Sequence, residues 1–503
     1  MPTSSLRPLK PPAFDYWAAQ HLLNRAGFGG TPAQVRALAD LGLDAAVDHI
    51  IDYREIPTDP VTPDAFDGEI MRPPTEREQV AMRQARRNGD EAAIEQARRE
   101  QQARQRADRR QIAEMQTWWL RRLVETPRPL EEKLTLFWHG HFATGYRTIE
   151  NSYHMFLQNQ MFRHHATGSF KDLAFGIIRD PAMIRYLNNN QNRRERPNEN
   201  LARELMELFT LGEGHAYTER DIKEGARALT GYTYVHNDFV FREEQHDPEP
   251  KRILGRVASS GEDFVSIILG RPEVSQFISW KLYRYFVNDM PGDPDRDSQQ
   301  FILQLAKLFR QKDYELRPLL RTLFKSEHFY DDANRASLIK NPIQLIVQAV
   351  RSLHTPTRSL AGLISAGDLM GQDLFFPPSV KGWDGGRAWI NTSTMFVRQN
   401  ALVYLLTGQR PDAYPWQTDG ATYDAMHLIE HLDPGDGEID VTAAVTYLLR
   451  FNLGFEPDPS RVRTLVQFVQ AHGGRLSTRT RQTNDLVIAL LSLITAMPEY
   501  QLC

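Results

Sequence analysis

A polar stripe on one predicted helix is the first candidate for chemistry. Between residues 198 and 209, Leu201, Leu205 and Leu208 recur at helical spacing and predict an amphipathic helix. The complementary positions hold an amide, a guanidinium and two carboxylates, namely Asn200, Arg203, Glu204 and Glu207. A surface helix would show solvated Lys and Glu there, so we expect this helix to form one wall of a polar pocket. The alternative is an Arg203–Glu207 ion pair, with Glu204 capping or bridging another helix.

A histidine pair, His139 and His141, is the second candidate. On a regular helix the two side chains would point about 200° apart. Gly140 and Gly145 predict that the helix ends nearby, which would let both imidazoles face one pocket. Histidine is the commonest metal ligand and the usual proton carrier near neutral pH. The alternative is structural, with one His hydrogen-bonded in the core and the other packed against Trp138.

Two loops supply further candidates. His246 and Asp247 lie with Lys251 in a proline-rich loop, where they could complete a metal shell with the histidine pair. A clasp between Asp247 and Lys251 is the alternative. The segment 377–391 has glycines, amides and two tryptophans, a composition that suits carbohydrate or peptide contact. Its alternative is a buried structural loop that docks Trp383 into the core.

These patterns lead to a set of predicted roles. The predicted catalytic residues are His139, His141, Arg203, Glu204 and Glu207. The predicted substrate-binding residues are Asn198, Asn200, Lys251, Trp383, Arg387 and Trp389. The predicted metal ligands are His139, His141, Glu204, His246 and Asp247. Imidazole and carboxylate ligands without thiolates would suit a divalent metal such as Zn, Fe, Mn or Cu.

The elements that must position these residues are helical almost throughout. The fold class predicted is all-α, a multi-helix globular fold with at most a minor β-hairpin. The hairpin is expected at 232–235 and 239–241, around His236-Asn237-Asp238. A helix beginning near Pro129 should carry Trp138. Other helices are expected at 15–26, 32–40, 43–52, 150–165, 170–179, 198–211, 218–230, 262–269, 273–289, 296–311, 315–325, 341–353, 395–407, 440–451, 459–471 and 484–497.

Residues 76–112 are dense in Arg, Glu, Gln and Ala, which are strong helix formers, and contain few large apolar residues. With a turn at 88–90, they predict two polar helices that form a projecting hairpin. A solvated or partly disordered insertion is the alternative reading, and contact with a partner or polyanion is the functional one. We expect a main helical domain at 1–408 and a C-terminal helical subdomain at 409–503, packed on it and separated by the Pro/Gly/Asp-rich segment 409–437.

Composition and missing motifs exclude several classes of function. The net charge is −4 over 503 residues, so nothing in the overall charge favours nucleic acid or an anionic membrane. Cys503 is the one cysteine, which excludes an intrachain disulfide and a Cys-ligated zinc or iron–sulfur centre. The sequence lacks a P-loop, a Rossmann fingerprint, a GxSxG elbow, HExxH and the Glu-x-x-His of di-iron bundles. No run of eighteen apolar residues predicts a membrane span.

Six blocks resemble those of one bacterial family, that of domain of unknown function number eighteen hundred. They are HLLNRAGFG at 21–29, FWHGHF at 137–142, NENLARELMELFTLG at 198–212, the stretch from YTE to RALTG at 217–231, HDPEPKRILG at 246–255 and PPSVKGWDGG at 377–386. Gly140 stands where the family usually has Asn. The resemblance covers about 15–405, but the family carries no established function.

The resemblance also bears on partners and location. Members are often encoded beside a secreted alkaline-phosphatase-like protein, and many are exported, which implies a periplasmic or extracellular place. The N-terminus lacks the apolar region of a secretory signal, which favours the cytoplasm instead.

Two hypotheses follow for the function. The first is an enzyme with a His/Glu/Arg/Asp pocket, in one version metal-dependent, that acts on an extracellular polymer or peptide. The second is a non-catalytic binding or assembly partner of the phosphatase-like protein.

Overall fold

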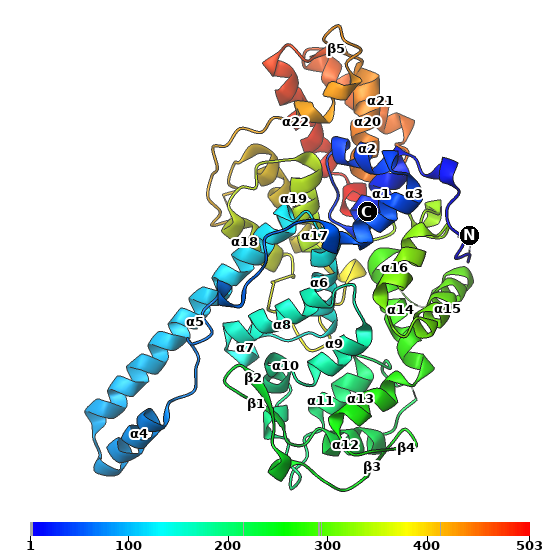
Figure 1. Cartoon of the computed structure of the whole chain (residues 1–503). Coiled ribbons are helices and arrows are strands. Elements are labelled where there is room, and N and C mark those ends of the chain that lie inside the picture. The colour runs from blue at the N-terminus through cyan, green and yellow to red at the C-terminus, as the bar shows by residue number, and fades with distance from the viewer. Residues whose placement is uncertain (1–3, 215, 290–291, 293, 413) are drawn as a thin grey trace.

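The computed structural model describes residues 4–214, 216–289, 292, 294–412 and 414–503. In this part of the chain the structure is mostly helical, and its strands form only two-stranded sheets (Figure 1). The all-α prediction is therefore confirmed. None of the described helices combines the length and the apolar character needed to cross a membrane.

Three helices near the N-terminus pack on the middle of the chain. They are α1 (Tyr16–Ala26), α2 (Pro32–Asp40) and α3 (Gly42–Ile51), as the periodicity predicts. Thr31 begins α2 with a capping box that includes Gln34, and Pro32 follows at the first helical position. The apolar face of α3 packs on α16 (Leu316–Lys325).

The polar segment forms a projecting arm of two helices, α4 (Glu76–Asn88) and α5 (Glu91–Glu125) (Figure 1). Gly89 ends α4 in the left-handed region, and Asp90 caps α5 by accepting from the N–H of Ala93. The predicted hairpin and its turn are confirmed. However, α5 runs without a break into the core, where Asp108 and Gln111 are buried. The expected insertion, 76–112, therefore includes buried residues near its end, and its limit at residue 112 stays a prediction.

The central layer begins with α6, which packs on α5 and α8 and ends at the histidine pair. Its members are α6 (Pro129–His141), α7 (Tyr146–Ile149), α8 (Ser152–His164), α9 (Phe170–Ile177), α10 (Pro181–Tyr186), α11 (Asn200–Glu207) and α12 (Glu219–Ala228). Glu132 of α6 is fully buried and joins three helices. It pairs with Arg122 of α5 and accepts from Arg163 Nε of α8 at 2.7 Å, and Trp119 Nε1 of α5 donates to it at 2.9 Å.

The strands make three small antiparallel sheets. They are β1 (Tyr232–Val235) with β2 (Asp238–Phe241), β3 (Lys251–Ile253) with β4 (Arg256–Ala258), and β5 (Glu438–Ile439) with β6 (Leu476–Ser477). The register of the first pair sets Tyr232 opposite Phe241, which confirms the predicted hairpin. The other two pairs were not predicted because two or three residues are too few to show alternation.

The rest of the chain is again helical. It comprises α13 (Gly261–Leu269), α14 (Pro272–Phe286), α15 (Arg296–Gln311), α16, α17 (Pro342–Leu353), α18 (Leu360–Leu369), α19 (Thr392–Thr407), α20 (Val441–Leu453), α21 (Pro459–Ala471) and α22 (Arg481–Thr495). The C-terminal end returns to the main body, where Ile339 pairs with Leu502 and Arg398 donates to the side chain of Gln501. A division at 408/409 stays a prediction.

Candidate functional site

The polar stripe of α11 is mainly an ion-pair network. Arg203 pairs with Glu219 at 2.8 Å, Glu199 at 3.0 Å and Glu207 at 3.3 Å. The hydrogen bonds that Arg203 donates to Glu219 are the main reason that the pKa of Arg203 is raised. Glu204 is half-buried, and burial together with the nearby Glu207 charge raises its pKa. Of these side chains, Glu207 lines a cavity.

The two amides before this helix act on its first turn. Asn198 accepts from the N–H of Asn200 at 3.0 Å through Oδ1, and its own N–H donates to Asn192 Oδ1 at 2.9 Å. These bonds shape the turn that starts α11. Neither Asn198 nor Asn200 lines a cavity described below.

His139 is buried and holds a loop in place. Its Nε2 accepts from the N–H of Phe375 at 3.2 Å, and its ring lies against Trp119 and Trp383. Burial lowers the pKa of His139 to about 3, so the ring stays neutral at neutral pH.

His141 turns to different partners. Its Nε2 donates to the carbonyl oxygen of Phe209 at 3.0 Å. Its Nδ1 is buried, with no hydrogen-bond partner in the described part of the chain. Burial, and secondarily the charge of Lys281, lowers the pKa of His141 to about 3. The two histidines therefore do not face one pocket: His141 lines a cavity, whereas His139 holds the loop at Phe375.

The His246–Lys251 loop is a self-contained clasp. His246 Nδ1 lies 2.8 Å from the Thr230 carbonyl oxygen, and Asp247 accepts from Arg227 Nε at 2.7 Å. Lys251 is buried and donates to the carbonyl oxygens of Asp247 and Ser259. The carboxylate of Asp247 thus pairs with Arg227, while its main chain holds Lys251.

The partners of this clasp all come from residues 227–259, whereas those of the histidine pair come from other parts of the chain. Across the described residues, no group of three or more His, Cys, Asp or Glu side chains is placed to hold a metal ion. The predicted metal ligands are not brought together.

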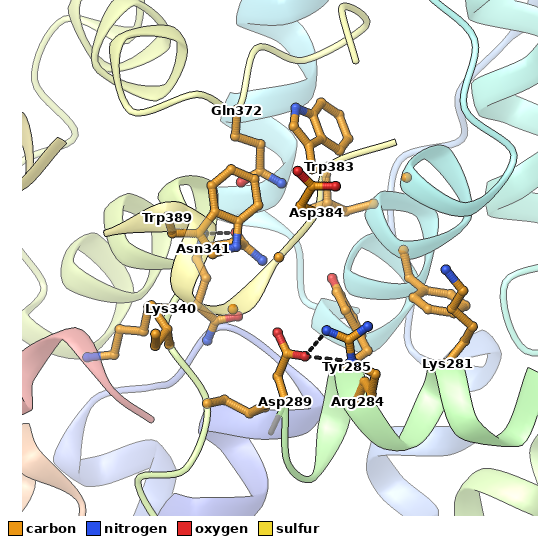
Figure 2. A pocket seen from close by; sticks show the side chains of 18 of the residues that line it. Lys281, Arg284, Tyr285, Asp289, Lys340, Asn341, Gln372, Trp383, Asp384 and Trp389 are labelled. Atoms are coloured by element: carbon orange, nitrogen blue, oxygen red, sulfur yellow. Dashed lines mark hydrogen bonds and ion pairs between the residues drawn. The ribbon is translucent and has the colours of Figure 1, made fainter. Parts of the chain in front are cut away.

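A small cavity, called here the inner cavity, lies where α1, α6, α14 and α17 meet the segment 372–389 (Figure 2). Its volume is about 170 Å³. Its aromatic walls include Trp383 and Trp389 of the predicted loop, while Arg387 is exposed and lies outside the lining. The basic side chains in its lining are Arg25, Lys133, Lys281, Arg284, Lys340 and Lys381.

Lys133 is buried and forms no ion pair with a described residue. Its Nζ donates to the Gly27 carbonyl oxygen at 2.7 Å and to the Gln344 side chain. Burial lowers the pKa of Lys133 to about 7; the Cys503 charge opposes this shift, and Arg25 adds to it. A lysine with such a pKa exists as both ammonium and free amine near neutral pH.

Arg25 and Lys281 also lack a carboxylate partner among the described residues. Arg25 is buried and donates to carbonyl oxygens, including those of Val287 at 2.7 Å and Asn334 at 2.6 Å. Lys281 lies near the rings of Phe277 and Trp280, at 5.4 and 5.7 Å. Burial, aided by the charge of Arg284, lowers the pKa of Lys281 to about 8.

The other cations of the inner cavity are engaged elsewhere. Arg284 pairs with Asp289, as Figure 2 shows, and Lys381 pairs with Glu213 at 2.6 Å. The ammonium of Lys340 donates to the Tyr500 carbonyl oxygen at 2.7 Å and points away from the cavity. Three cations of the lining are therefore left without an ion-pair partner among the described residues, namely Arg25, Lys133 and Lys281, while Asp384 and Cys503 line the same cavity.

A second cavity, the outer cavity, adjoins the first and has a volume of about 620 Å³. It adds Phe277, Trp280 and Glu207 to the wall. The residues that line both cavities are His141, Lys281, Arg284, Lys381, Trp383 and Asp384. The two cavities thus adjoin along these residues, and together they are called the recess, with a small end that holds the unpaired cations and a wider aromatic end.

A larger groove, of about 1280 Å³, lies between α2, α3 and the C-terminal end of α17. It contains His354 and His427, whose ring centroids are 5.4 Å apart. Arg351 is the one arginine of its lining, no lysine lines it, and Glu125 and Asp424 do, so the groove does not repeat the cationic character of the inner cavity.

Sequence reasoning missed the lysines and the arginine of the inner cavity. Arg25 lies in the HLLNRAGFG block and Lys133 four residues after Pro129, so both are in segments whose pattern is recognisable in the sequence. The feature that could have revealed Lys133 is its place on a helix that is buried on all sides, since lysine is rarely fully buried. Residues 130–139 of α6 are all buried.

The comparison with family models gives one match. The model described as "Protein of unknown function (DUF1800)" covers residues 21–502. No curated protein and no solved structure matches the chain. The six sequence blocks and a match over nearly the whole length agree, and the chain belongs to the DUF1800 family.

Proposed function

We propose that this protein is an enzyme that binds an anionic substrate in the inner cavity. The observation that carries the proposal is the set of three cations, Arg25, Lys133 and Lys281, that line one small cavity without a carboxylate partner among the described residues. Burying a positive charge without a counter-charge is costly. Cys503 offsets part of this cost for Lys133. A carboxylate, sulfate or phosphate group of a ligand in the inner cavity would supply the remaining negative charge.

The enzymatic part of the proposal rests on the lysines. A general base works best when its pKa lies near the operating pH, and Lys133 and Lys281 have pKa values of about 7 and about 8. Either amine could take a proton from a substrate whose charged group is held beside it. The substrate class that follows is an acidic polymer or an acidic peptide.

The first experiment measures the binding of sulfate and of acetate by calorimetry. The variant is Lys281→Met, because this side chain is only half-buried and its loss should leave the fold intact. We expect at least one of the two anions to bind and Lys281→Met to weaken that binding about tenfold. Lys171→Met is the matched control, since Lys171 pairs with Asp313 outside the cavity. The proposal would be refuted if neither anion binds, or if Lys281→Met leaves the measured affinity unchanged.

Turnover is tested separately, on acidic polysaccharides and acidic peptides. If the free amine of Lys133 or Lys281 is the base, the turnover rate should fall as the pH decreases through about 7 to 8, because the amine becomes protonated. If an anion binds but none of these substrates is turned over, the cavity is a binding site and the proposed catalytic activity is rejected.

A second proposal, a binding or assembly role, is favoured by the projecting arm. The outer parts of α4 and α5 are exposed and stand away from the body in Figure 1. By the family resemblance, the partner would be a secreted alkaline-phosphatase-like protein. Removal of the arm should abolish co-purification with that protein while anion binding is unchanged; unchanged co-purification would remove this role.

A further inference from the structure

One helix, α14, lines three cavities in succession. The inner cavity reaches its last turn at Arg284, and the outer cavity extends from there to Glu273. A third cavity of about 400 Å³, called here the helix groove, lies between the first turns of α14, from Pro272, and the neighbouring α15 (Figure 1). The helix groove shares Gln276 and Leu303 with the outer cavity, so the three cavities adjoin in one row along α14.

The row of cavities has the length of a short extended chain. Gln276, Trp280 and Arg284 follow one another four residues apart, so they share one face of α14. From Pro272 to Arg284 the helix rises about 18 Å. An extended peptide covers that distance with about five residues.

The middle of the row is apolar. Leu208, Phe277, Trp280 and Leu303 line the outer cavity, and none of the four is fully buried. Leu303 is 47 % exposed, and the ring centroids of Phe277 and Trp280 are 6.0 Å apart. Apolar surface left exposed inside a cavity is typical of a site that takes an apolar group of a ligand.

The charges in the wall of the outer cavity are mostly paired. Glu207, Glu213 and Glu273 have ion-pair partners at 3.3, 2.6 and 3.0 Å. Lys281 and Asp384 form no ion pair with a described residue, and both also line the inner cavity. The unpaired charges of the row are therefore concentrated at its inner end, next to the apolar middle.

These features distinguish an acidic peptide from an acidic polysaccharide. A sugar ring carries hydroxyl groups around its edge, and a hydroxyl set against a leucine side chain loses its hydrogen bonds with water, which costs free energy. An apolar peptide side chain has no such hydrogen bonds to lose, and its burial is favourable. Gln276 and Gln299 are exposed amides in the same wall, and each can both donate to and accept from a peptide backbone.

We infer that the substrate is an acidic peptide bound in extended form along α14, with its acidic group in the inner cavity, apolar side chains against Trp280 and Leu303, and its remaining residues in the helix groove. This inference rests on the proposed function and names the class of its substrate. It does not follow from the cations alone, since these would accept any small anion.

The first experiment compares blocked five-residue peptides by calorimetry. The reference peptide is acetyl-Ala-Ala-Leu-Phe-Glu-amide, in which the glutamate carries the only charge. One comparison peptide has serine in place of leucine and phenylalanine, and the other has glutamine in place of glutamate. Each is also made in the reversed sequence, because a chain can run along α14 in either direction. In one direction the reference peptide should bind at least tenfold more tightly than both comparison peptides.

Leu303→Ser tests the apolar middle of the row. Leu303 is exposed, so its replacement should leave the core intact, and it should weaken binding of the reference peptide about fivefold without changing that of the serine peptide. Leu369→Ser is the matched control. Leu369 is 45 % exposed, lies at the end of α18 and lines none of the three cavities, so binding of the reference peptide should be unchanged.

Peptide length tests the helix groove. A three-residue peptide, acetyl-Leu-Phe-Glu-amide, should bind about threefold more weakly than the reference peptide, because it is too short to reach from the inner cavity into the helix groove. Two further alanines beyond the five residues should add no affinity. Equal affinity of the three- and five-residue peptides would exclude the helix groove from the site.

Three results overturn the inference: a serine peptide that binds as tightly as the reference peptide, Leu303→Ser without effect on either, or trigalacturonate that binds more tightly than every peptide. In each case the proposed function stands if Lys281→Met still weakens the binding of acetate or sulfate. If neither anion binds, or if Lys281→Met leaves their affinity unchanged, the proposed function fails as well.

Discussion

Gly382 and Gly140 lie so close together that a Cβ atom on Gly382 would overlap the carbonyl oxygen of Gly140. Gly382 also has a φ of +77°, in the left-handed region that favours glycine. Next to it, the ring of Trp383 lies over Gly140. These contacts seat the loop on the last turn of α6, beside His141, and so build the wall that the two cavities share.

Gly382→Ala should therefore disrupt the recess. The positive φ alone costs about 1–3 kcal/mol for a residue with a side chain, and the overlap with Gly140 adds to it. We expect a lower free energy of unfolding in urea and loss of acetate binding. Gly140→Ala is the matched control, because its Cβ would meet only Trp383 ring carbons, at 3.5 and 3.8 Å. It should be neutral or stabilising, by up to about 1 kcal/mol, since alanine is the better helix former. Equal effects of the two changes would contradict this account.

Lys133 should make stability depend on pH. In the folded protein Lys133 loses its proton near pH 7, whereas in the unfolded chain it does so near 10.5. Between these values the unfolded chain binds more protons, so the free energy of unfolding rises with pH, by up to about 1.4 kcal/mol per unit from this group. Lys133→Met should lose that part of the slope.

The measurement is urea unfolding of both proteins between pH 7 and 10. Lys281 and Lys340 have lowered pKa values too, but they are present in both proteins, so the difference reports Lys133 alone. Parallel slopes would show that Lys133 is not the buried, unpaired lysine described above.

Glu132 should be the most sensitive carboxylate of the central layer. Burial alone would raise its pKa, but Arg163 and Arg122 outweigh burial and lower it. Glu132→Gln leaves the buried Arg163 without its anion and Arg122 with Glu131 alone, which should cost roughly 3–5 kcal/mol at pH 7. The stabilisation by Glu132 is present above the unfolded pKa, about 4.3, and is lost as pH falls. Thermal unfolding should thus show a gap between the two proteins that narrows below pH 4. A gap that does not change with pH would contradict an ionised Glu132.

The arm should be removable without loss of folding if the deletion leaves the buried part of α5 in place. Arg104 and Arg72 both pair with Glu78, so the two helices meet at the base of the arm. Replacing residues 79–103 with a short Gly/Ser linker should leave the thermal midpoint nearly unchanged.

A cut extended to residue 112 should destabilise the protein, because it removes Asp108. That carboxylate accepts from Ser152 and Tyr146, and each buried group left without a partner costs about 1–3 kcal/mol. Asp108→Ala in the full chain should reproduce much of the loss. If the short replacement already prevents folding, the arm packs as part of the core.

Local patterns were enough to predict most helices and the first hairpin, because period and caps are properties of neighbouring residues. The same reasoning missed α18, whose Gly362 and Gly367 suggest a break but in fact let Trp416 and Ile343 pack closely. The inner cavity was out of reach for another reason. Lys133 donates to Gly27 and to Gln344, which lie 106 and 211 residues away in the sequence. Periodicity predicts which face of a helix is buried, but not which residues that face contacts.

The candidate site shows the same limit. Trp383, Trp389, His141 and Glu207 were singled out by residue type and do line the recess. Arg203 was predicted to be catalytic from its residue type, but Glu199 and Glu207, four residues to either side, and Glu219 of α12 neutralise its charge. Residue type indicates what a side chain could do, and the partners that decide it come from the fold.

Because α5 is one unbroken helix, it runs as a single stiff element from the tip of the arm into the core. Thirty-five residues of α-helix are about 50 Å long, and the inner end carries Trp119. That ring lies 5.4 Å from the ring of His139 and 5.0 Å from that of Phe375, and His139 in turn lies against Trp383. A continuous series of contacts, one rigid helix followed by edge-on and tilted rings, thus joins the exposed tip of the arm to the wall of the recess.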